Sequence, residues 1–287
     1  MNKPQLLCPS QCLLGEGPFC HAGQLYWFDI LQSQFHQCDE QGNNHQVTTF
    51  DEMFSAGAVL ENNDLILASE TALWQYHQAS KQLTKLHDLE ADNPVTRSND
   101  GRVDRQGGFW IGTMGKEAEH EAGAIYRYFR GELRCLRNHV TIPNAICFSP
   151  TGDTAYFVDS VEKIIYSWAL DDNGWPQGEA TVFVDLSDQL INPDGAVMDS
   201  EGYLWNAQWD GAQVIRYTPS GDVDQIIDLP VTRPTCPAFS TAGDQLFITT
   251  ARTDLTTEAL QEQPYAGGIF SFPITTKGLP DAKVLLP

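Results

Sequence analysis

The sequence predicts an all-β fold, a six-bladed β-propeller that forms a single domain over residues 1–287. The first observation behind this prediction is a short apolar pattern that recurs six times at intervals of 40 to 49 residues. A period of this length is typical of propeller blades, which have four strands each. A two-sheet sandwich is the all-β alternative, but it does not predict six nearly equal periods. The copies are LYWFDI, LILASE, FWIGTM, AYFVDS, LWNAQW and LFITTA, which begin at Leu25, Leu65, Phe109, Ala155, Leu204 and Leu246.

The second observation is that each repeat contains the segments of a small antiparallel sheet. A run rich in aromatic residues, such as AIYRYF or VIRYTP, follows the apolar pattern, and two apolar runs around a turn are typical of a β-hairpin. A third segment precedes each pattern: GEGPFC, SAGAVL, SNDGRVD, PNAICFS, PDGAVMD and PTCPAFS. We therefore expect at least three strands in each repeat. No long amphipathic stretch predicts a helix.

The chain is strongly acidic. It has 17 Lys and Arg residues against 38 Asp and Glu residues, which gives a formal net charge of −21. Nucleic-acid-binding proteins gain affinity by neutralising phosphates with Lys and Arg, so this charge disfavours a nucleic-acid partner and, for the same reason, an anionic membrane. The acidity has two interpretations: it keeps the protein soluble, or some carboxylates are gathered to hold a cation.

Neither the N-terminus nor the cysteines indicate export. The N-terminal sequence MNKPQLLCPSQC has one short apolar run before Pro9, far shorter than the core of a signal peptide or a membrane span. The 7 cysteines include no CxxC pair and no zinc-ribbon spacing. We therefore expect reduced thiols and a cytoplasmic protein.

Polar residues stand where the third segments begin. In a propeller these segments line the central channel, so their starts should meet at one mouth of it. Glu16, Asn99, Asp100, Asn144 and Asp194 occupy such starts, although a single residue of this kind is also typical of a turn. Two carboxylates and an amide oxygen on one axis form a hard oxygen site that suits Ca²⁺, Mg²⁺ or Mn²⁺ and tolerates Zn²⁺. Three protein ligands leave open positions, as a catalytic metal needs.

Two further features adjoin this mouth. Arg97 presents a fork of donors for hydroxyl or carbonyl oxygens, or it forms a surface ion pair. The turn over residues 115–123 is long and polar, with Glu117, Glu119 and Glu121, so it is either a lid that carries a carboxylate or a solvated loop. No His stands at the start of a third segment, and no HExxH, GxSxG or phosphate-binding loop occurs, so we expect neither a His base nor a Ser nucleophile.

These motifs make the sequence similar to the SMP-30/gluconolactonase/luciferin-regenerating-enzyme-like family, known in animals as regucalcin. The similarity runs from residue 14 to residue 272 through LGEGP, RSNDGRVDRQGGFWIGTM, IPNAICFSP with the later YFVDS, and NPDGAVMDSEGYLW. It implies a six-bladed propeller that hydrolyses sugar lactones with one divalent cation. Animal members have an aromatic residue where this chain has Ser98. The resemblance implies metal ligation by Glu16, Asn144 and Asp194 and sugar contacts from Arg97, Asn99 and Glu117.

The polar channel mouth and the resemblance together predict a metal-dependent lactonohydrolase. It opens an aldonolactone, such as gluconolactone or a pentonolactone, to the aldonic acid, and its partner is this small molecule. The cation acts as a Lewis acid while Asp194 takes a proton from the attacking water. Two other hypotheses stand beside it: a Ca²⁺-binding regulatory protein of the regucalcin type without turnover, and a protein-interaction propeller, which the missing GH…WD signature disfavours.

Overall fold

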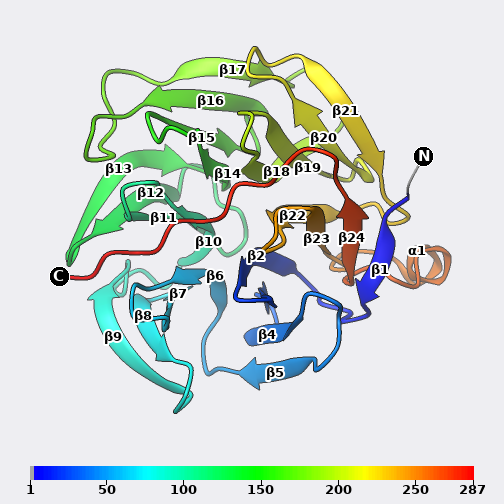
Figure 1. Ribbon diagram of the computed structural model, residues 1–287, viewed down its shortest axis with the longest axis horizontal. Helices are drawn as coiled ribbons and strands as arrows, with labels where there is room; N and C mark the ends of the chain where they lie inside the picture. Colours follow the sequence, from blue (N-terminus) through cyan, green and yellow to red (C-terminus); the bar gives the residue numbers. More distant parts are fainter. Residues whose placement is uncertain (1–2) are drawn as a thin grey trace.

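Antiparallel sheets of four strands surround a central axis. The structure, a computed structural model, describes residues 3–287, and within them six such sheets form the blades of a propeller (Figure 1). The segments predicted to begin each blade are indeed the innermost strands, so the prediction of an all-β, six-bladed fold is confirmed. These strands are β2 (Gly15–His21), β6 (Phe54–Val59), β10 (Thr96–Val103), β14 (Pro143–Phe148), β18 (Asn192–Met198) and β22 (Pro234–Phe239).

The repeated apolar pattern forms the second strand of each blade. Neighbouring blades pack on both faces of these strands, and two of them are buried at every position, the strands 65–69 and 109–115. A strand that is buried on both faces has a continuous apolar run rather than an alternating one, which is why the repeats are visible in the sequence. The second strands are β3 (Gln24–Asp29), β7 (Leu65–Ser69), β11 (Phe109–Gly115), β15 (Thr154–Asp159), β19 (Leu204–Trp209) and β23 (Gln245–Thr250).

The third and fourth strands lie farther from the axis. The third strands are β4 (Gln34–Asp39), β8 (Ala72–His77), β12 (Gly123–Phe129), β16 (Ile164–Ala169), β20 (Gln213–Tyr217) and β24 (Ile269–Pro273). The fourth strands are β5 (Gln46–Thr49), β9 (Gln82–Asp88), β13 (Glu132–Val140), β17 (Thr181–Asp185), β21 (Val223–Asp228) and β1 (Gln5–Cys8). The fourth strands are the most exposed, and in β21 only Ile227 is buried.

The N-terminal strand closes the last blade. β1 pairs with β24 in antiparallel register, with Gln5 opposite Ser271, so this sheet contains strands from both ends of the chain. At least three strands were expected in each repeat, and this fourth strand was not predicted. Because the two ends share one set of backbone hydrogen bonds, the ring cannot open without breaking them.

A buried cluster of carboxylate, indole and guanidinium groups stabilises the third blade. Asp104 accepts hydrogen bonds from Trp110 Nε1 (2.9 Å), Arg127 Nε (2.6 Å) and two backbone amides of its own turn. The carboxylate is therefore both paired and satisfied, as a buried charge needs to be. The fifth blade repeats this cluster with Asp199, Trp205 and Arg216.

The C-terminal strap, residues 274–287, crosses the ring at the ends of the innermost strands, in front of the blades in Figure 1. Val284 forms a β-bridge with Leu60, which follows β6. Arg102, near the end of β10, is buried and donates a hydrogen bond to Asp281 of the strap at 3.3 Å. The strap thus covers the mouth of the ring opposite the strand starts.

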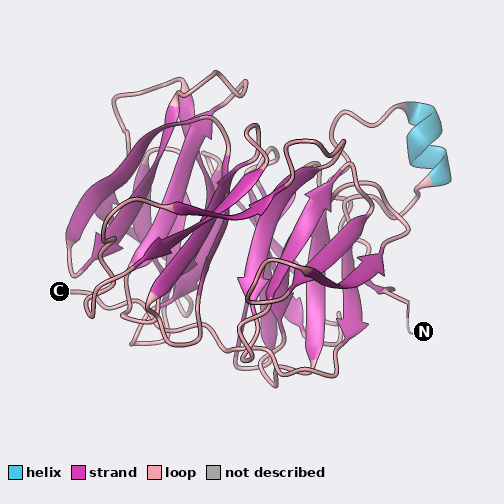
Figure 2. Ribbon diagram, turned by 90° about the horizontal axis from the view of Figure 1, so that it is seen from above, coloured by secondary structure: helices cyan, strands magenta, loops and turns pink. Residues whose placement is uncertain are grey.

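One short helix, α1 (Thr257–Glu262), lies among the described residues, in the connection between β23 and β24. The Thr256 side chain caps it by accepting a hydrogen bond from the Ala259 amide. The helix protrudes beyond the sheets (Figure 2). Within residues 3–287, no helix is long and apolar enough to cross a membrane.

We expect Asp104→Ala to lower the free energy of unfolding by about 3–5 kcal/mol, because it leaves a buried guanidinium without its partner. Both Asp104 and Arg127 have side chains that are 0% exposed. Urea denaturation measures the change. The control is Glu132→Ala, which removes an exposed carboxylate–arginine pair of the same blade (Glu132–Arg134) and should change the stability much less, because solvent screens this pair. Equal losses in the two variants contradict the prediction.

Candidate metal and substrate site

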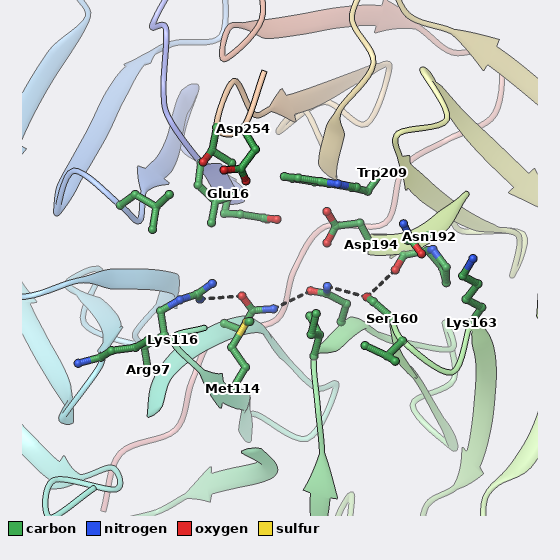
Figure 3. A pocket seen from close by; sticks show the side chains of 18 residues that line it. Glu16, Arg97, Met114, Lys116, Ser160, Lys163, Asn192, Asp194, Trp209 and Asp254 are labelled. Carbon is green, nitrogen blue, oxygen red and sulfur yellow. Dashed lines mark hydrogen bonds between the residues drawn. The ribbon is translucent and has the colours of Figure 1, made fainter. Parts of the chain in front are cut away.

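A cavity of about 530 Å³ opens at the mouth where the innermost strands begin. Pockets of roughly 300–1,000 Å³ are typical of small-molecule sites, so this one has room for a monosaccharide. Its walls include Glu16 on β2, Arg97 and Asn99 on β10, Asn144 on β14 and Asp194 on β18 (Figure 3). The structure thus brings five of the six site residues expected from the sequence to one cavity.

Irregularities in strand pairing place these side chains. The register between β2 and β3 shifts directly after Glu16, and the register between β14 and β15 shifts directly after Asn144. The next residues, Gly17 and Ala145, both have φ of 55°, in the left-handed region that favours glycine. A Cβ at Gly17 would lie 2.2 Å from the Ser55 carbonyl oxygen, so only glycine fits there. Bulges of this kind redirect a side chain, and here they turn the strand starts toward the channel.

The carboxylates at this mouth repel one another. Glu16 is 7% exposed, Asp194 6% and Asp100 4%. Burial, followed by the charge of Asp100, raises the pKa of Glu16 to about 8. Burial and the charges of Glu16 and Asp100 raise the pKa of Asp194 well above its ordinary range. Arg97 opposes both shifts, and although burial lowers its own pKa to about 10, it remains charged at neutral pH.

The donor set fits a hard divalent cation. Arg97 does not neutralise the buried carboxylates of Glu16 and Asp194, since burial and the neighbouring acids outweigh its charge. Oxygen ligands of this type are those that Ca²⁺, Mg²⁺ and Mn²⁺ prefer. Residues 3–287 contain no group of three or more His, Cys, Asp or Glu side chains arranged to hold a metal ion. A cation at this mouth would therefore depend on the amide oxygen of Asn144 beside Glu16 and Asp194.

A chain of hydrogen bonds connects the walls of the cavity, drawn as dashed lines in Figure 3. Arg97 Nη1 donates to Asn99 Oδ1 (2.8 Å), and Asn99 Nδ2 donates to Asn144 Oδ1 (2.9 Å). Asn144 Nδ2 then donates to Ser160 Oγ (2.9 Å), which donates to the Pro193 carbonyl oxygen (2.6 Å). A guanidinium only donates, and an amide accepts at one end and donates at the other, so the first bond sets the direction of the rest.

This direction decides which atoms are left for a ligand. Asn144 Oδ1 receives one hydrogen bond and keeps its second lone pair, so it can still coordinate a cation. Asn99 Nδ2 is fully used, by Asn144 and by the Pro143 carbonyl oxygen at 3.0 Å. Asn99 therefore has only one lone pair of Oδ1 for a substrate hydroxyl.

The two remaining residues expected to contact a sugar differ in position. Arg97 Nη1 donates to the Ser98 carbonyl and to Asn99, whereas within residues 3–287 its Nε and Nη2 make no hydrogen bond, so these donors face the cavity free. Glu117 lies in the exposed turn after β11 and is not part of the cavity wall. Its neighbour Lys116 lines the cavity instead.

Several residues that line this cavity were not predicted from the sequence. Ser160 and Trp209 stand at the outer ends of the apolar patterns AYFVDS and LWNAQW, while Lys163 and Asp254 lie in the connections that follow second strands (Figure 3). The residues expected at the site came from the starts of the innermost strands and from the turn over residues 115–123, not from the ends of the second strands. A polar or large aromatic residue at the end of an apolar pattern was the available signal.

Comparisons with known proteins agree with this architecture. The model of the SMP-30/gluconolactonase/LRE-like region matches residues 14–252. L-arabinolactonase of Azospirillum brasilense is 33% identical over 94% of this chain and 91% of its own length. The 6-deoxy-6-sulfogluconolactonase of Pseudomonas putida is 30% identical over 93% of this chain and 93% of its own length. A crystal structure of a calcium-binding protein, regucalcin, from Agrobacterium tumefaciens superposes with a TM-score of 0.96 at 36% identity, covering 99% of this chain and 98% of that one.

The family match covers most of the chain. The similar proteins align over nearly their whole length with about a third of residues identical, and the Agrobacterium tumefaciens structure has the same fold. It includes every strand that carries a residue of the cavity wall discussed above. The chain therefore belongs to the SMP-30/gluconolactonase/LRE-like family.

Proposed function

We propose that this protein is a metal-dependent lactonohydrolase that opens a sugar lactone, such as gluconolactone or a pentonolactone, to the aldonic acid. One observation carries the proposal: the buried carboxylates of Glu16 and Asp194 and the amide of Asn144 line one cavity at the channel mouth. The names of the relatives, L-arabinolactonase and 6-deoxy-6-sulfogluconolactonase, support hydrolysis of a sugar lactone.

The proposal takes residues 1–287 as a single domain, since β1 completes the last blade and the C-terminal strap crosses the ring. The net charge of −21 supports a small-molecule substrate rather than a nucleic acid or an anionic membrane. The cytoplasmic location expected from the N-terminal sequence and the cysteines remains a prediction.

Glu16, Asn144 and Asp194 would hold one divalent cation: Ca²⁺, Zn²⁺, Mg²⁺ or Mn²⁺. When bound, such a cation supplies Lewis acidity, which polarises a carbonyl and makes water easier to deprotonate. Arg97 binds ring oxygens through its free Nε and Nη2 donors, and Asn99 accepts from a hydroxyl, so together they orient the lactone. An Asp194 oxygen takes the proton of the attacking water and returns it to the ring oxygen when the acyl–oxygen bond breaks.

Removal of the cation is expected to abolish lactonase activity. Protein stripped with a chelator is assayed on several aldonolactones after subtraction of the spontaneous rate, and added divalent cation should restore turnover. Asp194→Ala should lower kcat by about 10²–10⁴-fold, the range of general-base catalysis. Asp88→Ala, which removes an exposed carboxylate of β9, is the control. Full activity in the stripped wild-type protein contradicts the proposal.

A second function is favoured by the similarity to the calcium-binding regucalcin structure. A Ca²⁺-binding regulatory protein would use the same three residues without turnover. Titration calorimetry separates the two functions when it is combined with the lactone assays. Tight Ca²⁺ binding and an inert lactone panel support the regulatory protein, whereas cation-dependent turnover supports the enzyme.

The stability of the cation-free protein should fall as the pH rises from 5 to 8. Folding raises the pKa of Glu16 from 4.5 to about 8, so in this window the folded state binds more protons than the unfolded state. The free energy of unfolding then decreases with pH. Glu16→Gln removes this titration, so its melting temperature should fall less steeply, with a gap of several °C at pH 8, since each kcal/mol shifts the melting temperature by about 2–4 °C.

Scanning calorimetry at several pH values measures this difference. Glu61→Gln, at an exposed turn position, controls for the loss of one negative charge and should follow the wild-type profile. A gap between Glu16→Gln and wild type that is the same at pH 5 and pH 8 contradicts the prediction.

Glu117 contacts the substrate only if its turn moves toward the cavity, and we include that movement in the proposal. Glu117→Ala should then raise KM by about 10-fold with little change in kcat, the effect of one lost hydrogen bond to a charged group. Glu121→Ala is the matched control, because Glu121 lies in the same turn and faces His139 at 3.8 Å. Steady-state kinetics on the preferred lactone test this, and equal KM values for Glu117→Ala and wild type remove Glu117 from the substrate site.

A further inference from the structure

We propose that Ser160 is a positioning residue for the cation site. Its hydroxyl holds the side-chain amide of Asn144 and, at the same time, the backbone that precedes Asp194. The inference rests on the proposed function, because it takes Asn144 and Asp194 as cation ligands. Ser160 acts through these two residues and is not itself a ligand in this proposal.

The Ser160 hydroxyl connects the two strands that carry these residues. Oγ accepts a hydrogen bond from Asn144 Nδ2 on β14 at 2.9 Å and donates one to the Pro193 carbonyl on β18 at 2.6 Å. Ser160 is 8% exposed and Asn144 4%, so water competes weakly for these bonds. One hydroxyl thus links the side chain of one ligand to the peptide group next to the other.

The single proton of the hydroxyl makes this link directional. The Pro193 carbonyl only accepts, so the proton of Ser160 points to it and Oγ must accept from Asn144. Asn144 Nδ2 is thereby fixed on the side of Ser160, and Oδ1 on the side where Asn99 Nδ2 donates to it. Rotating the Asn144 amide by half a turn would lose both bonds and set its N–H groups against those of Asn99.

The backbone of Ser160 is itself held in place. The carboxylate of the preceding residue, Asp159, accepts hydrogen bonds from the amides of Thr141 (2.7 Å) and Ile142 (3.0 Å). The Ser160 amide donates to the Ile142 carbonyl at 3.0 Å. These bonds anchor Ser160 to the residues just before β14, so its hydroxyl has a defined position relative to Asn144.

The same turn occurs elsewhere in the ring without a hydroxyl. In the first blade Asp29 accepts from the Leu14 amide, and the Ile30 amide donates to the Leu14 carbonyl at 3.0 Å, as Ser160 does in the fourth blade. In the last blade Ala251 occupies this position. Since Ile and Ala are compatible with this backbone, the turn does not require serine. The hydroxyl at residue 160 is therefore needed for its hydrogen bonds with Asn144 and Pro193 rather than for the turn.

Ser160→Ala removes the acceptor of Asn144 and the donor of Pro193. Loss of a group that orients a metal ligand typically costs about 10–100-fold in affinity, so we expect a loss of this size for the cation. Ser160→Thr keeps a hydroxyl and should retain most of the affinity. Titration calorimetry with Mn²⁺ or Ca²⁺ alone on the cation-free, full-length protein measures these values.

The matched control is Ser149→Ala. Ser149 lies in the same blade near the opposite mouth, is 9% exposed and donates a hydrogen bond to Asp153 at 2.8 Å. Its loss should lower stability without changing cation affinity. Melting temperatures of the cation-free variants show that each one is folded before it is titrated.

Two further measurements separate positioning from substrate contact. In an Asn144→Ala background, the loss of cation affinity caused by Ser160→Ala should shrink, because the main residue through which Ser160 acts is gone. Raising the cation concentration should restore part of the turnover that Ser160→Ala loses at limiting cation, because the variant acts through cation affinity. The inference is overturned if Ser160→Ala lowers cation affinity as much in the Asn144→Ala background as in the wild-type protein. It is also overturned if Ser160→Ala leaves cation affinity unchanged but lowers kcat at saturating cation.

The outcome also distinguishes this inference from the proposed function. Wild-type protein that binds neither Mn²⁺ nor Ca²⁺ would contradict the cation-dependent function, and the inference with it. Wild-type binding together with unchanged affinity in Ser160→Ala contradicts the role of Ser160 alone.

Discussion

Closing six twisted sheets into a ring forces their innermost strands to begin around one axis, whatever side chains those strands carry. Glu16, Asn144 and Asp194 come from the first, fourth and fifth blades, and ring closure brings them to one cavity. The electrostatic cost appears in the raised pKa values of both carboxylates. The apolar clusters between neighbouring blades supply the stability that offsets it, since each second strand is buried on both faces.

Buried carboxylates in this ring have two kinds of surroundings. Asp104 is surrounded by an indole, a guanidinium and two backbone amides, so its charge is balanced within the blade. The Asp194 carboxylate accepts no side-chain hydrogen bond among residues 3–287, and burial with the charges of Glu16 and Asp100 outweighs the opposing charge of Arg97. A balanced carboxylate stabilises the fold, whereas an unbalanced one is available to a cation or a proton.

The sequence was sufficient to predict the blades because burial on both faces produces apolar runs that repeat at the blade period. The polar residues at the starts of buried strands also predicted that Glu16, Asn144 and Asp194 meet at the channel mouth, and in the structure they line one cavity there. β1 was missed because its four residues, QLLC, carry no periodic signal and pair with a strand at the other end of the chain. For Ser160 the sequence shows only a polar residue at the end of an apolar pattern, because its proposed role also depends on the Pro193 carbonyl, and a backbone acceptor cannot be recognised in the sequence.

The C-terminal strap has a kinetic consequence for the cavity at the other mouth. Arg102 and Cys236 are buried near the axis, and the strap lies beyond them, on the side of the ring away from the cavity. In the proposed reaction the lactone and its acid then share the mouth at the strand starts, where Lys116 and Lys163 line the cavity wall. Opening a neutral lactone creates a carboxylate, so accumulated acid competes with the lactone for this cavity and the proposed reaction is subject to product inhibition.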